Sequence, residues 1–169
     1  MSAKKTCVEM LEQRNYTINN EEETNIIATK PDGSKVIVFF SDAVKFNVKN
    51  IQTYISEMND LAIFHGIVVY KDCITSFTKK AITKSPDMKI ELFPERDLRY
   101  NITKHRLQPR FQQLSPSESE EFKKKYGIKY GIIKIDDPIA RFYDYNKGDV
   151  IRVIRKKGEC DFITYRIVR

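Results

Sequence analysis

The sequence has few of the residues that build metal and redox sites. Among 169 residues there are two histidines, three cysteines and no tryptophan. Cys7, Cys73 and Cys160 lie far apart, so no cysteine pair has the close spacing that brings two ligands to one metal. An odd number of distant cysteines also argues against a disulfide framework. We therefore expect reduced thiols, no metal site and no cofactor.

Long apolar runs are also missing. No stretch approaches the roughly 18 residues of a membrane helix, and polar residues follow Met1 where a signal peptide would have its apolar core. The composition, with 41% hydrophobic and 31% charged residues but only six glycines and six prolines, excludes a disordered or collagen-like chain. We expect an intracellular protein that does not bind membranes, folded as one domain or two small ones.

Basic residues concentrate in the C-terminal part of the chain. Residues 1–98 hold 13 basic and 14 acidic side chains, whereas residues 99–169 hold 17 and 9, which gives net charges of −1 and +8. The polar residues 101–109 follow this change and are predicted to form an extended connector. We therefore divide the chain into domains of residues 1–98 and 99–169. The basic surplus suits a partner that carries phosphates or acidic side chains.

The first domain alternates between strand and helix patterns. Apolar residues recur at helical spacing from Val48 to Met58, which predicts a helix that ends near Asp60. The nearly continuous apolar run at residues 61–70 is typical of a strand buried on both faces. The remaining predictions are helices over residues 4–14 and 79–82, and strands over residues 25–29, 35–40 and 89–93. This order predicts a small α/β domain with a mixed sheet.

The second domain contains two local patterns that start helices. Ser115 and Glu118 have the spacing of a capping box before a helix through residue 126, and Asp137 and Pro138 open a short helix through residue 143. Strands are predicted over residues 150–155 and 162–168, separated by a loop over residues 157–161. This domain is therefore a small α+β unit that ends in an antiparallel hairpin, and the whole chain is α+β.

A magnesium-dependent nuclease is one alternative function. Its chemistry needs an Asp and then an acid-x-Lys on adjacent strands, so that carboxylates hold the metal. Lys71 has Val69 two residues before it, where the carboxylate should stand, and no lysine follows Glu91. Asp87 and Glu91 could serve as metal ligands by residue type, but they lack the spacing that a nuclease needs. We therefore expect no catalytic residue.

A free-standing DNA-binding regulator is the other alternative. Basic triplets at residues 123–125 and 155–157 lie near aromatic residues, but no RNA-binding motif or zinc finger frames them. Arg141, Arg152 and Arg166 differ, because they stand among apolar residues. That pattern is typical of arginines that meet a planar acidic partner or a protein interface.

The second domain also resembles a known family. The runs IDDPIARFY at residues 135–143, KGDVIRVIRK at residues 147–156 and TYRIV at residues 164–168 follow one another in that family's order. They closely resemble the assembly domain of the fifth subunit shared by nuclear RNA polymerases I, II and III, which has an equivalent in the archaeal RNA polymerase. Residues 101–109, 114–115 and 125–128 match the same family upstream.

The first domain resembles the same subunit more loosely, over segments that include residues 38–40, 44–54, 62–69 and 91–93. They look like the eukaryotic jaw domain, which the archaeal equivalent lacks, so the resemblance implies a eukaryotic or eukaryote-like viral branch. Phe111 replaces a family histidine, Asp144 a glycine and Ser76 a proline. A compact jaw beside a well-kept assembly domain is compatible with a large DNA virus as the source.

The resemblance implies a noncatalytic polymerase subunit. In that family the first domain has a nuclease-like fold without catalytic acids and projects toward downstream duplex DNA, while the second packs on the largest subunit. The expected location is the nucleus, or a viral factory or virion if a virus encodes the chain. The expected polymerase-interface residues are His105, Pro109, Asp137, Pro138, Arg141, Gly148, Arg155, Tyr165 and Arg166. The expected DNA-proximal residues are Lys71, Thr75, Lys79 and Lys80.

Overall fold

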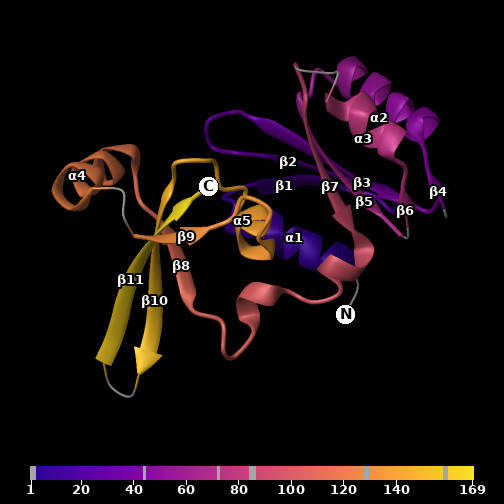
Figure 1. Cartoon of the computed structure of the whole chain (residues 1–169). Coiled ribbons are helices and arrows are strands. Elements are labelled where there is room, and N and C mark those ends of the chain that lie inside the picture. The colour runs from indigo at the N-terminus through magenta and orange to yellow at the C-terminus, as the bar shows by residue number, and fades with distance from the viewer. Residues whose placement is uncertain (1–2, 44, 72, 84–86, 128–129, 158–159) are drawn as a thin grey trace. The chain divides into compact units, whose positions relative to one another are not determined.

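The computed structural model describes residues 3–43, 45–71, 73–83, 87–127, 130–157 and 160–169. The chain divides into two compact units, Met1–Tyr100 and Asn101–Arg169. Each unit has its own β-sheet and its own helices (Figure 1). In the described ranges no helix is both long enough and apolar enough to cross a membrane.

The mixed sheet that the sequence predicts forms the centre of the first unit, and it has five strands, one more than expected. Its strands, in spatial order, are β1 (Thr17–Glu21), β2 (Asn25–Thr29), β3 (Lys35–Ser41), β5 (His65–Tyr70) and β7 (Lys89–Pro94). The β1–β2 and β2–β3 pairs are antiparallel, whereas β3–β5 and β5–β7 are parallel. Parallel neighbours need crossover connections, and helices supply both of them here.

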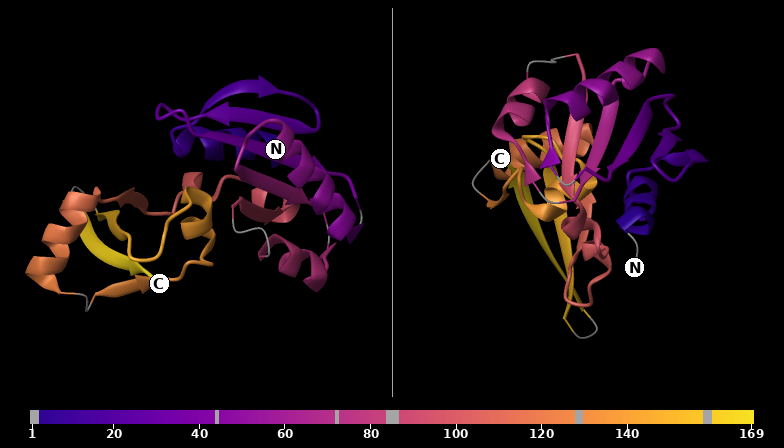
Figure 2. Two further views of the ribbon diagram at one scale, coloured as in Figure 1. Left: turned by 90° about the horizontal axis from the view of Figure 1, so that it is seen from above. Right: turned by 90° about the vertical axis from the view of Figure 1, so that its right-hand side faces the viewer.

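The two crossover helices are α2 (Val48–Asp60) and α3 (Ser76–Thr83), which lie on one face of the sheet (Figures 1 and 2). The α1 helix (Ala3–Gln13) lies on the opposite face. Two-residue strands β4 (Lys45–Phe46) and β6 (Cys73–Ile74) pair beside the crossovers as a small parallel sheet. The five-stranded sheet is therefore the middle of three layers.

Side chains point alternately to the two faces of this sheet, and both faces are packed with apolar residues. Ile37 and Phe39 of β3 are buried in a cluster with Met58 of α2, whereas Val36 and Val38 are buried on the other face. Gly66 of β5 allows α2 to approach closely, because a Cβ there would lie 2.6 Å from the Met58 Sδ. The run that predicts a buried strand thus also needs one position without a side chain.

A charged network is buried on the α1 side of the sheet. Arg14 follows α1 and binds Glu91 of β7 in a bidentate ion pair, with both Nη–Oε distances at 2.8 Å. His65 of β5 contacts the same carboxylate, with its Nε2 at 2.7 Å from the Glu91 Oε1. The other ring nitrogen of His65, Nδ1, is 3.1 Å from the Tyr16 hydroxyl. Burial raises the pKa of Glu91, but the hydrogen bond with His65 and the charge of Arg14 outweigh it and hold the pKa at about 2.

The second unit has a four-stranded sheet. Its spatial order is β8 (Arg110–Gln113), β10 (Val150–Lys157), β11 (Cys160–Val168) and β9 (Gly131–Ile133). The β8–β10 and β10–β11 pairs are antiparallel and β9 runs parallel to β11. The predicted C-terminal hairpin is confirmed. Two helices, α4 (Pro116–Tyr126) and α5 (Pro138–Tyr143), complete the unit.

Several sequence predictions have wrong bounds. The strand predicted over residues 61–70 begins only at His65, because Ala62 has a φ of 51° and turns the chain out of α2. The helix predicted over residues 79–82 spans Ser76–Thr83. The extended connector over residues 101–109 contains a 3-10 helix, η2 (Ile102–Lys104), because the Asn101 side chain accepts from the Thr103 amide at 3.0 Å.

The hairpin loop predicted over residues 157–161 is also wrong at its ends. The strands continue further, since Lys157 pairs with Cys160. The glycine expected in that loop, Gly158, lies outside the described residues. Five strands were not predicted from the sequence: β1, β8 and β9, and the two-residue strands β4 and β6. A second 3-10 helix, η1 (Glu95–Leu98), was not predicted either, and it follows β7 directly.

The first prediction concerns the buried Glu91. Glu91→Gln should lower the free energy of unfolding at neutral pH by about 3 kcal/mol, because the Arg14 guanidinium is left buried without its counter-charge. In the parent chain, the stabilisation from Glu91 is complete above its ordinary pKa of 4.5 and disappears as the pH falls toward about 2. The variant should lack this acid-dependent loss. Urea unfolding across that pH range measures both effects.

The control is Glu12→Gln on the exposed side of α1. This variant removes a carboxylate at the surface, so its unfolding curves should follow those of the parent at every pH. If both variants behave alike, the buried ion pair does not supply the acid-sensitive stability of the first unit.

Candidate functional site

The two faces of the β8–β10–β11–β9 sheet carry different helices. On one face, Ile151 and Val153 of β10 are buried in a cluster with Ile139 and Ala140 of α5. On the other face, Tyr165 of β11 packs against α4. We call these the α5 face and the α4 face. Because side chains alternate along a strand, every residue of the hairpin belongs to one of these two faces.

The expected interface residues Arg155 and Arg166 lie on the α5 face. Arg155 continues the series of Ile151 and Val153 along β10 and is exposed, and Arg166 pairs with Ile151 across the hairpin. The Arg166 stem passes Gly131 of β9, where a Cβ would lie 3.4 Å from its Cγ. Arg166 is half-buried. This arrangement brings two guanidinium groups to the face that α5 covers.

The α5 helix places three more of the expected interface residues. The Asp137 side chain accepts a hydrogen bond from the Ile139 amide at 2.9 Å, and Pro138 occupies the first turn. Both residues therefore start the helix, as the sequence predicts. Arg141 is half-buried on α5, beside the buried Ala140. Asp144, where the family has glycine, ends the helix in the left-handed conformation at a φ of 58°.

Gly148 forms the turn between α5 and β10. Its φ of 91° is a conformation that residues with a side chain rarely adopt. Its amide donates to the Val168 carbonyl at 2.9 Å, and its carbonyl accepts from the Lys123 Nζ at 2.7 Å. Gly148 therefore ties the turn to both β11 and α4.

Two further interface candidates lie in the connector. His105 ends η2 and is exposed, and its Nδ1 accepts from the Leu107 amide at 3.3 Å. Pro109 is half-buried and stands directly before β8. The structure thus gives both residues a local role in directing the chain from η2 into the sheet.

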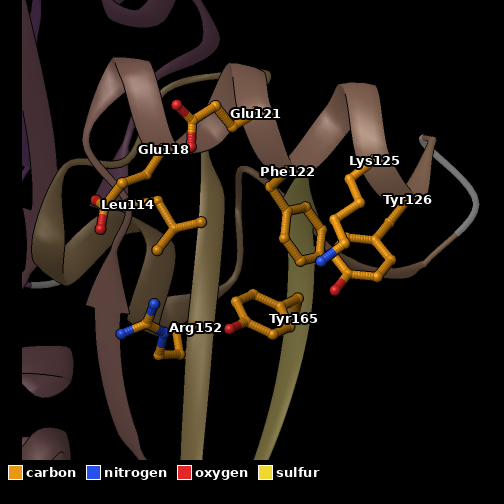
Figure 3. Close-up of a pocket in the computed structure, with 8 residues that line it drawn as sticks. All are labelled: Leu114, Glu118, Glu121, Phe122, Lys125, Tyr126, Arg152 and Tyr165. Carbon is orange, nitrogen blue, oxygen red and sulfur yellow. The ribbon is translucent and has the colours of Figure 1, made fainter.

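Tyr165 lies apart from the interface arginines, on the α4 face. Its ring centroid is 4.3 Å from that of Phe122, which also contacts Tyr126 at 4.8 Å and Tyr130 at 5.1 Å. The Arg152 guanidinium stands 5.8 Å from the Tyr165 ring centroid. Burial raises the pKa of Tyr130. A cleft of about 200 Å³ lies between α4 and the hairpin, and its lining includes Phe122, Tyr126, Tyr165 and Arg152 (Figure 3).

The cleft was not predicted from the sequence. The spacing of Phe122 and Tyr126 places both on one side of α4, which was a visible signal. The pairing of Arg152 with Tyr165 depends on the strand register, which the spacing of residues does not give.

The expected DNA-proximal residues are contained in one segment of the first unit, from Lys71 to Lys80. Lys71 follows β5 and pairs with Asp42 at 2.7 Å, where both side chains are well exposed. Thr75 begins α3, since its Oγ1 accepts from the Thr78 amide at 3.2 Å. Lys79 and Lys80 are exposed on α3, as is Phe77, which retains 76% of its accessible surface. The segment thus presents several cations beside the carboxyl ends of the parallel strands.

Comparison with known protein families and sequences gives a consistent result. Residues 100–168 match the family described as RNA polymerase Rpb5, C-terminal domain. The chain is 31% identical to the "DNA-directed RNA polymerases I, II, and III subunit rpabc1" of Dictyostelium discoideum, over 99% of this chain and 95% of that protein. It is 36% identical to the "Putative DNA-directed RNA polymerase subunit 454R" of Invertebrate iridescent virus 6, over 95% of each chain.

A plant protein and one solved structure extend the comparison. The "DNA-directed RNA polymerase V subunit 5C" of Arabidopsis thaliana is 27% identical over 98% of this chain and 82% of that protein. The structure of EndoMS in apo form aligns with 56% of this chain and 47% of that chain, at 13% identity and a TM-score of 0.39. A likeness that weak does not indicate a shared fold.

The second prediction concerns the turn at Gly148. Gly148→Ala should destabilise the second unit by about 1–2 kcal/mol, because its φ of 91° is costly for a residue with a side chain. A Cβ there would meet no other atom within 4 Å, so the cost is one of backbone conformation alone. Hydrogen exchange of the β10 and β11 amides measures the loss. Gly131→Ala, at a glycine without a positive φ, should change the exchange much less. Equal losses would mean that the conformation of the turn is not the cause.

Proposed function

The chain belongs to the Rpb5 family of RNA polymerase subunits, and from this membership we propose that it is a noncatalytic component of a multisubunit DNA-directed RNA polymerase. The observation that carries the proposal is the similarity to named polymerase subunits over 95% or more of both chains. A protein that had kept only the fold would not be expected to match over its whole length.

The environment of its acidic residues supports a noncatalytic role. Both oxygens of Glu91, a nuclease candidate on composition, are held by Arg14. The Asp137 side chain is engaged in capping α5. Asp87 is exposed, outside the buried network. A magnesium-dependent nuclease needs free carboxylates held together, whereas the carboxylate of Glu91 is already bound by Arg14 and His65.

We propose that the second unit docks on the largest polymerase subunit through its α5 face. Arg155 and Arg166 lie on this face of the sheet and Arg141 lies on α5 itself, and we expect them to supply planar donors for acidic side chains of the partner. The net charge of +8 over residues 99–169 favours the same kind of partner. Asp137, Pro138 and Gly148 hold α5 and its turn in place, and His105 and Pro109 direct the connector.

We propose that the first unit forms part of a jaw near downstream duplex DNA. The segment from Lys71 to Lys80 presents exposed cations, with Thr75 at the start of α3. The net charge of −1 over residues 1–98 opposes strong binding of free DNA, because affinity for DNA rises with the number of phosphates that a protein neutralises. The contact therefore depends on the polymerase holding the segment close to the duplex. This also argues against a free-standing DNA-binding regulator.

The proposed location follows from the polymerase. Relatives named as subunits of RNA polymerases I, II and III support the nucleus, and the iridescent virus relative supports a viral factory or virion for a virus-encoded chain. Purification of the tagged chain from its native cells tests the assembly role, and mass spectrometry identifies the chains recovered. Stoichiometric recovery of the two large polymerase subunits is expected. Recovery of the folded chain alone would contradict the proposal.

The third prediction concerns charge on the α5 face. Arg141→Glu and Arg166→Glu should each reduce recovery of the large polymerase subunits by at least about tenfold, because the reversed charge repels the acid that the arginine meets. The measurement is the ratio of the large subunits to the tagged chain after a wash at moderate salt.

The matched control is Lys124→Glu, an equal change of charge at an exposed position of α4, on the other face of the sheet. It should leave recovery unchanged. Thermal unfolding of each purified variant shows whether the unit still folds. Normal recovery with both arginine variants would mean that the α5 face is not the docking surface.

A further inference from the structure

The cleft between α4 and the β10–β11 hairpin lies on the sheet face opposite the proposed docking surface. Its lining residues are Leu114, Glu118, Glu121, Phe122, Lys125, Tyr126, Arg152 and Tyr165. Figure 3 shows Phe122, Lys125 and Tyr126 reaching from α4 toward Tyr165, with Arg152 on the other side of Tyr165, below Leu114 and Glu118. We propose that this cleft binds a peptide segment of a second partner protein, in which a carboxylate stands next to an apolar side chain.

Arg152 provides the site for the carboxylate. It is half-buried in β10, and among the described residues no acceptor reaches its buried Nε within hydrogen-bonding distance. Hydrogen bonds with Ser115 lower the pKa of Glu118, which lies close enough to Arg152 for the charge of that arginine to lower it further. One Glu118 oxygen, however, already accepts a hydrogen bond from the Ser115 amide at 2.8 Å in the capping box. A buried donor without an acceptor costs free energy. The Nε is out of contact with solvent, so a ligand carboxylate would meet the Nη groups of the same half-buried guanidinium. A carboxylate fits the planar guanidinium best.

The aromatic residues provide the apolar half of the site. Phe122 and Tyr165 are packed ring to ring at 4.3 Å, with the buried Leu114 beside them. Tyr126 retains 58% of its accessible surface although its ring contacts Phe122. Lys125 places its Nζ 5.1 Å from the Tyr126 ring centroid. An apolar side chain laid on Tyr126 and Phe122 would bury surface that this unit leaves open to water.

Charge around the cleft favours a peptide over a nucleic acid. Aromatic rings beside cations also suit stacked bases and phosphates. Here, however, Glu118 and Glu121 stand on the cleft wall and would repel a phosphate backbone. Lys123, the first residue of the basic run 123–125, donates a hydrogen bond to the Gly148 carbonyl and does not line the cleft. A peptide with one carboxylate brings a single negative charge near these glutamates, whereas a chain of phosphates brings several.

This surface goes beyond docking into the polymerase. Because α4 and α5 cover opposite faces of one sheet, the second unit can hold the largest subunit on one side and the proposed peptide on the other. The assay below uses the chain alone, so its outcome does not depend on whether the α5 face enters a polymerase.

The experiment selects from a phage-displayed library of random dodecapeptides on the full chain and measures the selected peptides by fluorescence anisotropy. The expected peptides carry Asp or Glu beside an aromatic or aliphatic residue. Arg152→Met should weaken their binding by at least about tenfold, and Tyr126→Ala by about fivefold. Lys124→Met, which removes an exposed charge outside the cleft on the same helix, should have no effect.

Three outcomes would overturn the proposal. Selected peptides without a carboxylate, or binding that survives both cleft variants, would exclude the site described. Failure to select any peptide that binds would exclude a peptide ligand. A single-stranded oligonucleotide that binds the chain and is lost with Arg152→Met and Tyr126→Ala would assign the cleft to nucleic acid instead. Since Tyr126 is largely exposed, Tyr126→Ala remains informative even if Arg152→Met fails to fold.

Discussion

The hydrogen-bond register between β10 and β11 determines what the C-terminal unit can bind. Arg152 pairs with Tyr165, and Val153 pairs with Thr164, on opposite faces of the sheet. A slip of one residue would turn Val153 out of the α5 core and bring a guanidinium into it, which is costly without a counter-charge. The pairing of β10 with β11 therefore places both the arginines on the α5 face and the aromatic residues of the cleft on the α4 face. A change in this register would alter both surfaces at once.

Local chemistry made much of the fold predictable. Ser115 and Glu118 form the reciprocal capping box that their spacing suggests, and Asp137 starts α5 as expected. The missed strands are those whose own sequence carries little signal. β1 is mostly polar and almost entirely exposed, and β9 is only three residues long. Their extended conformation is imposed by β2 and β11, the strands beside them. Such edge strands depend on partners distant in sequence, which local patterns do not reveal.

The candidate site was predictable to a smaller extent. Arginines among apolar residues drew attention to Arg141 and Arg166, and the structure has both half-buried in the second unit. The sequence did not show that Tyr165 lies on the opposite face from Arg166, because that follows from tertiary packing on α4. The partner of Glu91 was equally hidden, since Arg14 stands 77 residues away. Spacing identifies residue types suited to a role, whereas only the folded chain shows which of them share a surface.

The buried pair of Arg14 and Glu91 also has a consequence for how the first unit forms. Arg14 lies just after the first helix, whereas Glu91 belongs to the last strand of the sheet. Until that strand is in place, packing α1 on the sheet would bury a guanidinium without its counter-charge. We therefore expect α1 to dock on the sheet only after β7 has been synthesised. Until then, the face of α1 that packs on the sheet would stay in contact with water.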